Sequence, residues 1–332
     1  MLAAVAIAGF STTVAAAWPL RAIAVKYGIL DHPGPRKAQR APVPYLGGVA
    51  VVTGLVAALI VAQPHFLRVL ALVGLICALG LFDDLRHASV GGKLIGEAAV
   101  ALAAVVSGFT WHFTDSPWIN AGFSLLWIVG LSNSFNLLDN MDGLSSTTAA
   151  VPLIAYAVMA PVTLPLSLGL AAATLGFLVI NRPPAKMYLG DAGSLALGFG
   201  VAVVAIMGAN TDRGLHSVVL LVGPVALALF DTSLVIVSRL MNGKPVQLGG
   251  RDHFSHRLQL LGWSPYTILC AVAAISVTSS AITYLAIRYP GHSAWLAIPL
   301  AVAYGAAWLS LLQVNPYRSA KFTPEVVSAR NA

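Results

Sequence analysis

The chain has 332 residues, of which 58% are hydrophobic and only 9% are charged, with a formal net charge of +7. Soluble domains carry about 25% charged residues, so this composition excludes a water-soluble globular protein. The apolar residues stand in long blocks, and a membrane-spanning helix needs about 20 of them. No long polar stretch separates the blocks. The sequence therefore predicts an all-α, polytopic transmembrane protein that forms a single domain over residues 1–332.

Eleven apolar blocks are candidate membrane spans. They cover residues 1–20, 46–63, 66–82, 92–110, 119–137, 145–160, 163–180, 193–209, 216–238, 265–287 and 294–314. The first block has no basic residues ahead of its apolar run, so we expect a retained helix rather than a cleaved signal peptide. Cys77 and Cys270 fall inside apolar blocks, where we expect neither a disulfide nor a metal cluster.

The basic residues are divided unevenly between the two sides that eleven spans create. Sixteen of the 19 Lys and Arg residues fall in the loops 21–45, 83–93, 181–192 and 239–264, in the turn 138–144 and in the tail after residue 314. Lys and Arg accumulate in cytoplasmic loops. This side is therefore predicted to be cytoplasmic, with the N-terminus outside and the C-terminus inside. The positive charge is a topology signal and gives no reason to expect nucleic-acid binding.

Aspartates gather on the same side, although the positive-inside rule makes no demand on acidic residues. They are Asp83, Asp84, Asp139, Asp142, Asp191 and Asp252, and five of the six stand at the ends of apolar blocks. Carboxylates at helix ends on one side predict a site for a cation and phosphate groups at the membrane surface.

The first motif is the pair Asp83-Asp84 at the end of the third block. Adjacent carboxylates repel each other, and their ionisation costs more in a partly apolar setting than in water. A metal ion or a shared proton would relieve this cost. A simple polar stop at a helix end is the alternative interpretation.

The second motif runs from Asn133 to Gly143, with Asn133, Asn136 and Asn140 spaced as one stripe of a helix and Asp139 beside them. Hydrogen bonding between helices explains one such residue but not this cluster. Because polar residues are expensive to bury in a membrane, the cluster predicts a functional site. Gly143 suits a helix end or a close backbone approach.

Two further motifs follow. The run Gly190-Asp191-Ala192-Gly193-Ser194 opens an apolar helix, where small residues make a phosphate cradle, although Asp is also a common N-cap. The loop 239–264 holds Arg251, His253, His256 and Arg257, which could grip a diphosphate. A zinc site is disfavoured because no cysteine lies near. An ordinary solvated basic loop is the alternative to a diphosphate-binding loop.

Together with the early loop that holds Arg36-Lys37 and Pro44-Tyr45-Leu46-Gly47-Gly48, these segments resemble the polyprenyl-phosphate N-acetylhexosamine-1-phosphate transferase superfamily. The resemblance covers most of the chain and rests on the order of the five segments. It implies a helical enzyme of the bacterial inner membrane with a cytoplasmic active-site cleft. The early loop of this chain is more similar to the corresponding loop of enzymes that use UDP-N-acetylhexosamine than to that of the peptidoglycan-precursor translocase.

The resemblance also implies roles for individual residues. Asp83, Asp84, Asp139 and Asp142 are the expected catalytic residues, and Asp191 with Asp84 is expected to bind Mg²⁺, for which Mn²⁺ can substitute. The expected substrate-binding residues are Lys37, Asn133, Asn136, Tyr188, His253, His256 and Arg257. The expected substrates are a UDP-N-acetylhexosamine and polyprenyl phosphate. Oligomeric state stays open, with a homodimer as one arrangement.

At two positions the chain departs from the family pattern. Asn140 stands where the family has the first Gly of Asp-Gly-x-Asp-Gly, and Ser255 stands where the histidine motif often has His. Both positions belong to the nucleotide-sugar side of the implied site, so they leave the identity of the sugar open.

Asp231 lies inside an apolar block, about 12 Å from its cytoplasmic end at about 1.5 Å per residue. It is either a neutral acid bonded to a neighbouring helix or a support for the metal or nucleotide site. Because the family often carries Asp in this helix, we predict that it faces the cleft that holds Asp84 and Asp191 rather than lipid. A secondary transporter is the rival function, but it is expected to show internal repeats and carboxylates at mid-depth.

Overall fold

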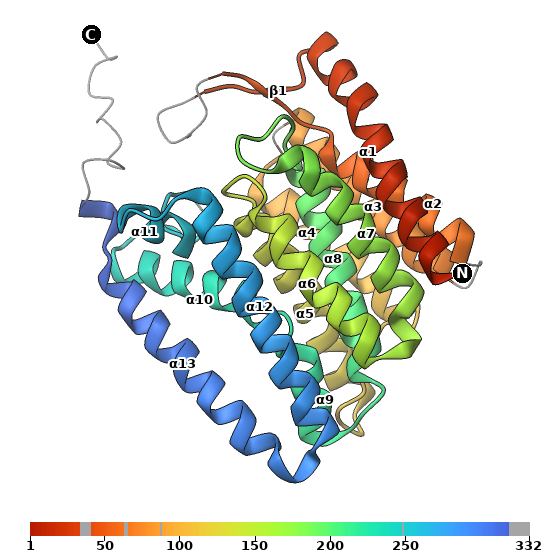
Figure 1. The fold of residues 1–332 in the computed structure, drawn as a ribbon, viewed down its shortest axis with the longest axis vertical. Coiled ribbons are helices and arrows are strands. Elements are labelled where there is room, and N and C mark those ends of the chain that lie inside the picture. The colour runs from red at the N-terminus through yellow and green to blue at the C-terminus, as the bar shows by residue number, and fades with distance from the viewer. Residues whose placement is uncertain (34–40, 63–65, 87, 248, 319–332) are drawn as a thin grey trace.

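A computed structural model describes residues 1–33, 41–62, 66–86, 88–247 and 249–318. Its architecture is a bundle of helices with one short β-hairpin, as Figure 1 shows. The helices of the first part of the chain are α1 (Leu2–Lys26), α2 (Gly47–Ala62), α3 (Leu67–Arg86), α4 (Val90–Val106), α5 (Pro117–Leu138), α6 (Leu144–Met159), α7 (Leu164–Asn181) and α8 (Gly190–Ala209). The later helices are α9 (Gly214–Val222), α10 (Ala226–Met241), α11 (Phe254–Leu260), α12 (Pro265–Arg288) and α13 (Ser293–Gln313).

Helix α8 is the centre of the bundle, and nearly all of its residues are buried. It packs against α3, α5, α2 and α6. Close packing is possible because α8 and its neighbours carry glycines at the crossings. A Cβ on Gly48 of α2 would stand 2.2 Å from the backbone nitrogen of Gly193, so neither helix could approach the other with a side chain there.

The helices confirm an all-α, polytopic membrane protein, but they do not confirm the predicted count of eleven spans. Every predicted block contains a helix. Among the described residues, however, six helices are long and apolar enough to cross a membrane by themselves: α1, α5, α7 together with the short helix before it, α8, α12, and α13 together with the short helix before it. Helices α2 and α6 have only 16 residues each.

The ninth block is broken rather than continuous. Helix α9 ends at Val222, α10 begins at Ala226, and the two helices are bent by 72°. The break falls at Gly223-Pro224, because proline cannot continue the hydrogen-bond ladder of a helix. Counted as one span, this bent pair raises the number of candidate spans to seven.

One end of the bundle collects the segments that the sequence analysis singled out. The hairpin of β1 (Leu30–Asp31) and β2 (Val43–Pro44), the start of α8 and helix α11 lie at this end in Figure 1, whereas the N-terminus lies at the opposite end. The hairpin is fixed by backbone hydrogen bonds from Tyr188 to Pro44 (2.8 Å) and from Gly47 to Tyr188 (3.0 Å).

Candidate active site

A cleft of about 760 Å³ opens at this end of the bundle. Five carboxylates line it: Asp31, Asp84, Asp139, Asp142 and Asp191. They come from the hairpin, from the end of α3, from the segment after α5 and from the start of α8. The sequence thus places acids at separate helix ends, and the packing of the helices brings them around one cavity.

The close contact between α3 and α8 sets the floor of the cleft. Gly80 allows it, since a Cβ on Gly80 would stand 2.3 Å from the carbonyl oxygen of Asp191. Asp84 then caps the start of α8, because its Oδ1 and Oδ2 accept hydrogen bonds from the backbone N–H groups of Asp191 (2.9 Å) and Ala192 (3.1 Å). Gly190 adopts a left-handed φ of 71° at this junction, a conformation that favours glycine.

Asp83 and Asp191 are joined by the ammonium group of Lys93. The Nζ atom of Lys93 lies 3.0 Å from Oδ2 of Asp83 and also contacts Oδ2 of Asp191. Lys93 lies on α4, one turn after its N-terminus, and α4 packs on α3. One cation therefore bridges the first acid of the pair on α3 and the acid that opens α8.

Asn136 holds the other side of Asp191. Its Nδ2 donates hydrogen bonds to Oδ1 of Asp191 and to Oγ of Ser194, both 2.9 Å long. Asn133 points elsewhere, because its Nδ2 donates to the buried carboxylate of Glu97 on α4 and to the carbonyl of Val129. Of the predicted asparagine stripe, Asn136 therefore serves the acid cluster, while Asn133 joins two helices.

Residues 139–143, here called the aspartate loop, turn the chain from α5 into α6. Gly143 has a left-handed φ of 74°, and its N–H donates to Oδ1 of Asn181 (2.9 Å). Asp142 accepts a 2.8 Å hydrogen bond from the backbone of Ala185. Burial, followed by the negative charges of Asp191, Asp84 and Asp142, raises the pKa of Asp139 to about 8. The loop therefore holds a carboxyl group that needs nearby positive charge in order to ionise.

Residues 249–257, here called the histidine loop, contribute to the wall of the cleft. Gly249, Gly250, Arg251 and His256 line it. Burial, with the neighbouring charges of His253 and Arg251, lowers the pKa of His256 to about 3, so its imidazole is neutral at neutral pH. The histidine can therefore donate or accept a hydrogen bond in the cleft, but it cannot supply charge there.

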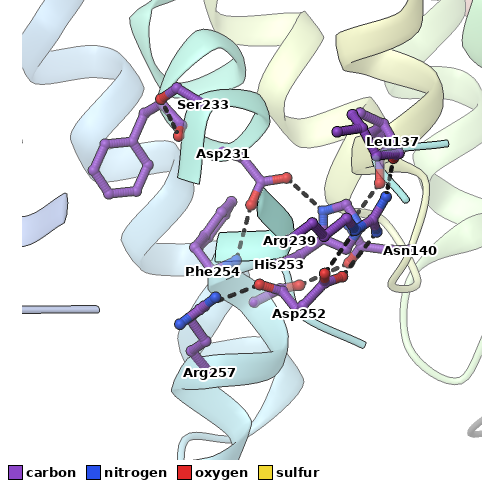
Figure 2. A network of polar contacts seen from close by, with 12 residues as sticks. Leu137, Asn140, Asp231, Ser233, Arg239, Asp252, His253, Phe254 and Arg257 are labelled. Carbon is purple, nitrogen blue, oxygen red and sulfur yellow. Dashed lines mark hydrogen bonds and ion pairs between the residues drawn. The ribbon is translucent and has the colours of Figure 1, made fainter. Parts of the chain in front are cut away.

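Asp231 anchors the histidine loop from the membrane side (Figure 2). Its carboxylate is fully buried, with Oδ2 2.7 Å from Nδ1 of His253 and Oδ1 2.8 Å from the backbone nitrogen of Phe254. The prediction that Asp231 turns away from lipid agrees with its full burial, but the prediction that it faces the cleft with Asp84 and Asp191 is wrong. Its carboxylate does not line the cleft but acts from behind, through His253, which in turn stands next to His256 with ring centroids 5.7 Å apart.

A second anchor comes from α10 and from the segment that follows α13. Arg239 binds both carboxylate oxygens of Asp252, at 2.7 and 2.9 Å, and Tyr317 donates a 2.6 Å hydrogen bond to the same group. Although burial alone raises the pKa of Asp252, the hydrogen bonds from Arg239 and Tyr317 outweigh it and lower that pKa to about 2. Arg257 is fully buried and donates from Nη1 to the carbonyls of Leu311 (2.9 Å) and Val314 (2.6 Å).

Comparison with known proteins agrees with this arrangement. The model of the family described as glycosyl transferase family 4 matches residues 66–209. The chain is 32% identical over 263 residues to a probable undecaprenyl-phosphate N-acetylglucosaminyl 1-phosphate transferase of Bacillus subtilis strain 168, a match that covers 74% of each protein. The chain belongs to glycosyl transferase family 4. The resemblance stated from the motifs is therefore confirmed.

Other members of glycosyl transferase family 4 are similar to the chain over different lengths. A putative glycosyltransferase of Streptomyces coelicolor is 33% identical over 336 residues, which is 95% of this chain and 77% of that protein. A phospho-N-acetylmuramoyl-pentapeptide-transferase of Lactococcus lactis is 36% identical over 203 residues, or 51% of this chain and 61% of that protein. Two of these three relatives are named for the transfer of a phospho-sugar.

The structure sorts the residues that were predicted from the family motifs. Those that line the cleft are Asp84, Asp139, Asp142, Tyr188, Asp191 and His256. Asp83 is linked to this group through Lys93, and Asn136 is linked to it by its hydrogen bond to Asp191. Asn133 and His253 instead bind Glu97 and Asp231, and Lys37 lies outside the described residues.

Arg257 needs a correction, because the sequence analysis placed it among the substrate-binding residues. Its guanidinium is fully buried, it does not line the cleft, and it donates to the backbone carbonyl of Asp252, to Ser238 and to the C-terminal carbonyls of α13. A cation that is committed to protein oxygens on several sides is not available to a diphosphate. Arg257 therefore holds the histidine loop to the C-terminal helix.

Sequence reasoning missed two basic residues at the site, Lys93 and Arg251, as individual site residues. Lys93 was counted only as a topology charge, although its position one turn into a helix that follows Asp83-Asp84 was a usable signal. Arg251 was considered with the diphosphate-gripping loop but was not among the selected residues. In the structure, Arg251 lines the cleft.

The donor set at the start of α8 fits a hard divalent cation. Mg²⁺ prefers oxygen ligands and keeps several waters, so it needs only one or two carboxylates from the protein. Among the described residues, no group of three or more His, Cys, Asp or Glu side chains has the arrangement of a metal site. Asp191, with Asp84 beside it, matches the smaller set that Mg²⁺ uses when phosphate oxygens and water complete its shell.

Proposed function

We propose that the protein transfers N-acetylhexosamine 1-phosphate, and specifically N-acetylglucosamine 1-phosphate, from a UDP-sugar to a polyprenyl phosphate. An oxygen of the lipid phosphate attacks the β-phosphorus of the UDP-sugar, the bond to the α-phosphate oxygen breaks, and UMP leaves. The product is a polyprenyl diphospho-sugar, which starts a cell-envelope glycan. The relatives in glycosyl transferase family 4 support this reaction type.

The observation that carries the proposal is the convergence of the acids of the family motifs on one cleft at one end of the helix bundle. Asp84, Asp139, Asp142 and Asp191 are separated by as many as 107 positions in the chain, yet all four line the same cavity. Phosphoryl transfer needs positioning and neutralisation of charge more than covalent chemistry. A cleft with this many carboxylates binds a diphosphate only if a cation stands between them.

Mg²⁺, for which Mn²⁺ can substitute, would supply the charge that bridges the carboxylates and the diphosphate. In this proposal Asp191 and Asp84 hold the metal ion. Asn136 orients Asp191 by its 2.9 Å hydrogen bond, and Lys93 neutralises the second oxygen of the same carboxylate. Asp142 and Tyr188 are placed on the cleft wall where a nucleotide can bind.

The acceptor is proposed to reach the site through a second cavity. A hollow of about 330 Å³ between α3 and α4 is lined by Asp83, Lys93, Leu79 and Phe82. Phe82 is 56% exposed on the outer surface of the helices, as suits a lipid-facing wall. Because Lys93 touches Asp83 and also Asp191 of the main cleft, a lipid phosphate at Asp83 would stand next to the donor diphosphate.

Location and organisation are part of the proposal. The positive-inside charge pattern supports a cytoplasmic cleft in the inner membrane of a bacterium, where a UDP-sugar is available. We further propose that residues 1–332 act as one catalytic domain, with a homodimer as the assembly to be tested.

The reaction can be tested with purified protein in detergent or lipid. UDP-N-acetylglucosamine, undecaprenyl phosphate and Mg²⁺ are mixed, UMP is measured by chromatography, and the lipid product is identified by mass spectrometry. The proposal predicts equal amounts of UMP and lipid-linked sugar, and loss of both in excess chelator. A protein that releases no UMP with any UDP-N-acetylhexosamine would refute it.

A further inference from the structure

The two positions where the chain departs from the family pattern touch each other beside the cleft. Ser255 of the histidine loop donates a 2.7 Å hydrogen bond from Oγ to Oδ1 of Asn140 in the aspartate loop. The two residues are 115 positions apart in the sequence. The contact therefore joins the two loops, and it exists only because both unusual residues are present.

The geometry fixes the amide of Asn140 from both ends. While Oδ1 accepts from Ser255, Nδ2 donates a 2.8 Å hydrogen bond to the carbonyl of Leu137, in the last turn of α5 (Figure 2). Asn140 also lines the cleft. A short chain of hydrogen bonds thus runs from the end of α5, through the cleft wall, to the histidine loop.

Ser255 is fully buried, and its neighbour His256 lines the cleft. A larger side chain at position 255 would meet the amide of Asn140, and overpacking of a close-packed site costs about 1–3 kcal/mol. The imidazole that the family pattern has at position 255 therefore fits only if the amide at position 140 is absent, which is the case when glycine stands there. The two departures compensate each other in hydrogen bonding and in volume.

We propose that Asn140 and Ser255 are a matched pair of positioning residues that holds the histidine loop against the aspartate loop and so sets the fit of the nucleotide sugar. The inference rests on the proposed function, because it assigns the cleft between these loops to the UDP-sugar. The pair acts through its neighbours, since Asp139 and His256, each next to one member of the pair, line the cleft.

The test is a double-mutant cycle built from Asn140→Gly, Ser255→His and the double variant. Asn140→Gly removes two hydrogen bonds, the one from Ser255 and the one to Leu137. It should therefore raise the KM for the UDP-sugar at least about 2- to 10-fold, the effect of one such bond. Ser255→His should raise it at least about tenfold, because the added volume is not accommodated. The double variant should return to within about threefold of the wild type, and the KM for polyprenyl phosphate should stay unchanged throughout.

A milder cycle keeps the inference testable if Ser255→His does not fold. Ser255→Ala removes only the donor to Asn140, so its effect should be no larger than that of Asn140→Gly, which also removes the bond to Leu137. The double variant should be no worse than Asn140→Gly alone. Asn242→Gly is the matched control, because Asn242 also donates from its amide to a helix carbonyl, that of Ser238 at 2.8 Å, but lies outside the histidine loop. Its KM values should equal those of the wild type.

Thermal unfolding of the same variants separates this inference from the proposed function. If the wild type transfers no sugar phosphate, the proposed function fails, while non-additive midpoints in the cycle would still establish the matched pair. Additive effects on both KM and unfolding, in either cycle, would overturn the inference.

Discussion

Asp139 offers the sharpest test of whether ionisation of a carboxylate in the cleft is unfavourable. Burial and the charges of Asp191, Asp84 and Asp142 raise its pKa to about 8, whereas an unfolded chain has an ordinary aspartate. Between about pH 4 and pH 8 the folded protein therefore binds one more proton than the unfolded chain. Stability contributed by this site falls as pH rises through that window and is constant above it. The variant Asp139→Asn has an amide at this position, which does not titrate.

The size of the effect follows from the shift. Each pKa unit corresponds to about 1.4 kcal/mol, so three units between pH 5 and pH 8 amount to about 4 kcal/mol for a fully shielded group. The Asp139 side chain is partly exposed to the cleft, and water there screens the charges, so we expect about half of this value. The variant should gain about 2 kcal/mol over the wild type between pH 5 and pH 8, or about 4 °C in the unfolding midpoint.

The assay is thermal unfolding of the purified wild type and Asp139→Asn across pH 5 to 8.5, without divalent cations. Asp115→Asn is the matched control, because Asp115 is an exposed carboxylate in the loop between α4 and α5, far along the chain from the cleft. Its curve should run parallel to that of the wild type. Saturating Mg²⁺ should close part of the gap between the wild type and Asp139→Asn, since a nearby cation favours the ionised carboxylate. Parallel curves for Asp139→Asn and wild type would refute the reasoning.

Three further predictions concern charge at the site and topology. Lys93→Met should lower kcat for UMP release at least about 100-fold, because Asp83 and Asp191 then face the phosphates without their shared ammonium; more than a tenth of wild-type turnover would contradict this. In the wild type, Mg²⁺ at a concentration 100-fold above its Kd should stabilise the protein by about 2.7 kcal/mol and raise the unfolding midpoint. Asp191→Asn should abolish this rise. An undiminished rise in the variant would place the metal site elsewhere. A cysteine at the exposed Gln247 should react with an impermeant maleimide only after cell lysis, whereas labelling of intact cells would invert the proposed topology.

Hydropathy predicted the helices well because the bilayer allows few alternatives for an apolar segment. Each apolar block contains a helix, and the acids stand at helix ends as expected. The break at Gly223-Pro224 was missed because the residues on both sides of it are as apolar as a continuous span. The dipeptide itself was the signal, since proline after glycine marks a turn even within an apolar run.

From the sequence, only those site residues could be predicted whose type is unusual in a membrane protein. Aspartates near membrane helices are rare, so the acidic motifs could be found from the sequence. Arginines in a loop are common, and nothing in the sequence distinguishes Arg251, which lines the cleft, from Arg257, which donates to carbonyls 54 and 57 positions away. That difference depends on where α13 ends in space, which local patterns do not encode.

The distribution of charge explains why a cation has to accompany the donor. On the histidine side two buried cations have partners within the protein, since Arg239 binds Asp252 and Arg257 donates to the carbonyls of Leu311 and Val314. On the aspartate side, Asp84, Asp139, Asp142 and Asp191 line the cleft, Asp31 of the hairpin adds a fifth carboxylate, and the ammonium of Lys93 is shared between Asp83 and Asp191. A diphosphate adds further negative charge to this wall. In the proposed function, the histidine side would orient the nucleotide sugar, and a divalent cation at Asp191 would make binding of its phosphates favourable.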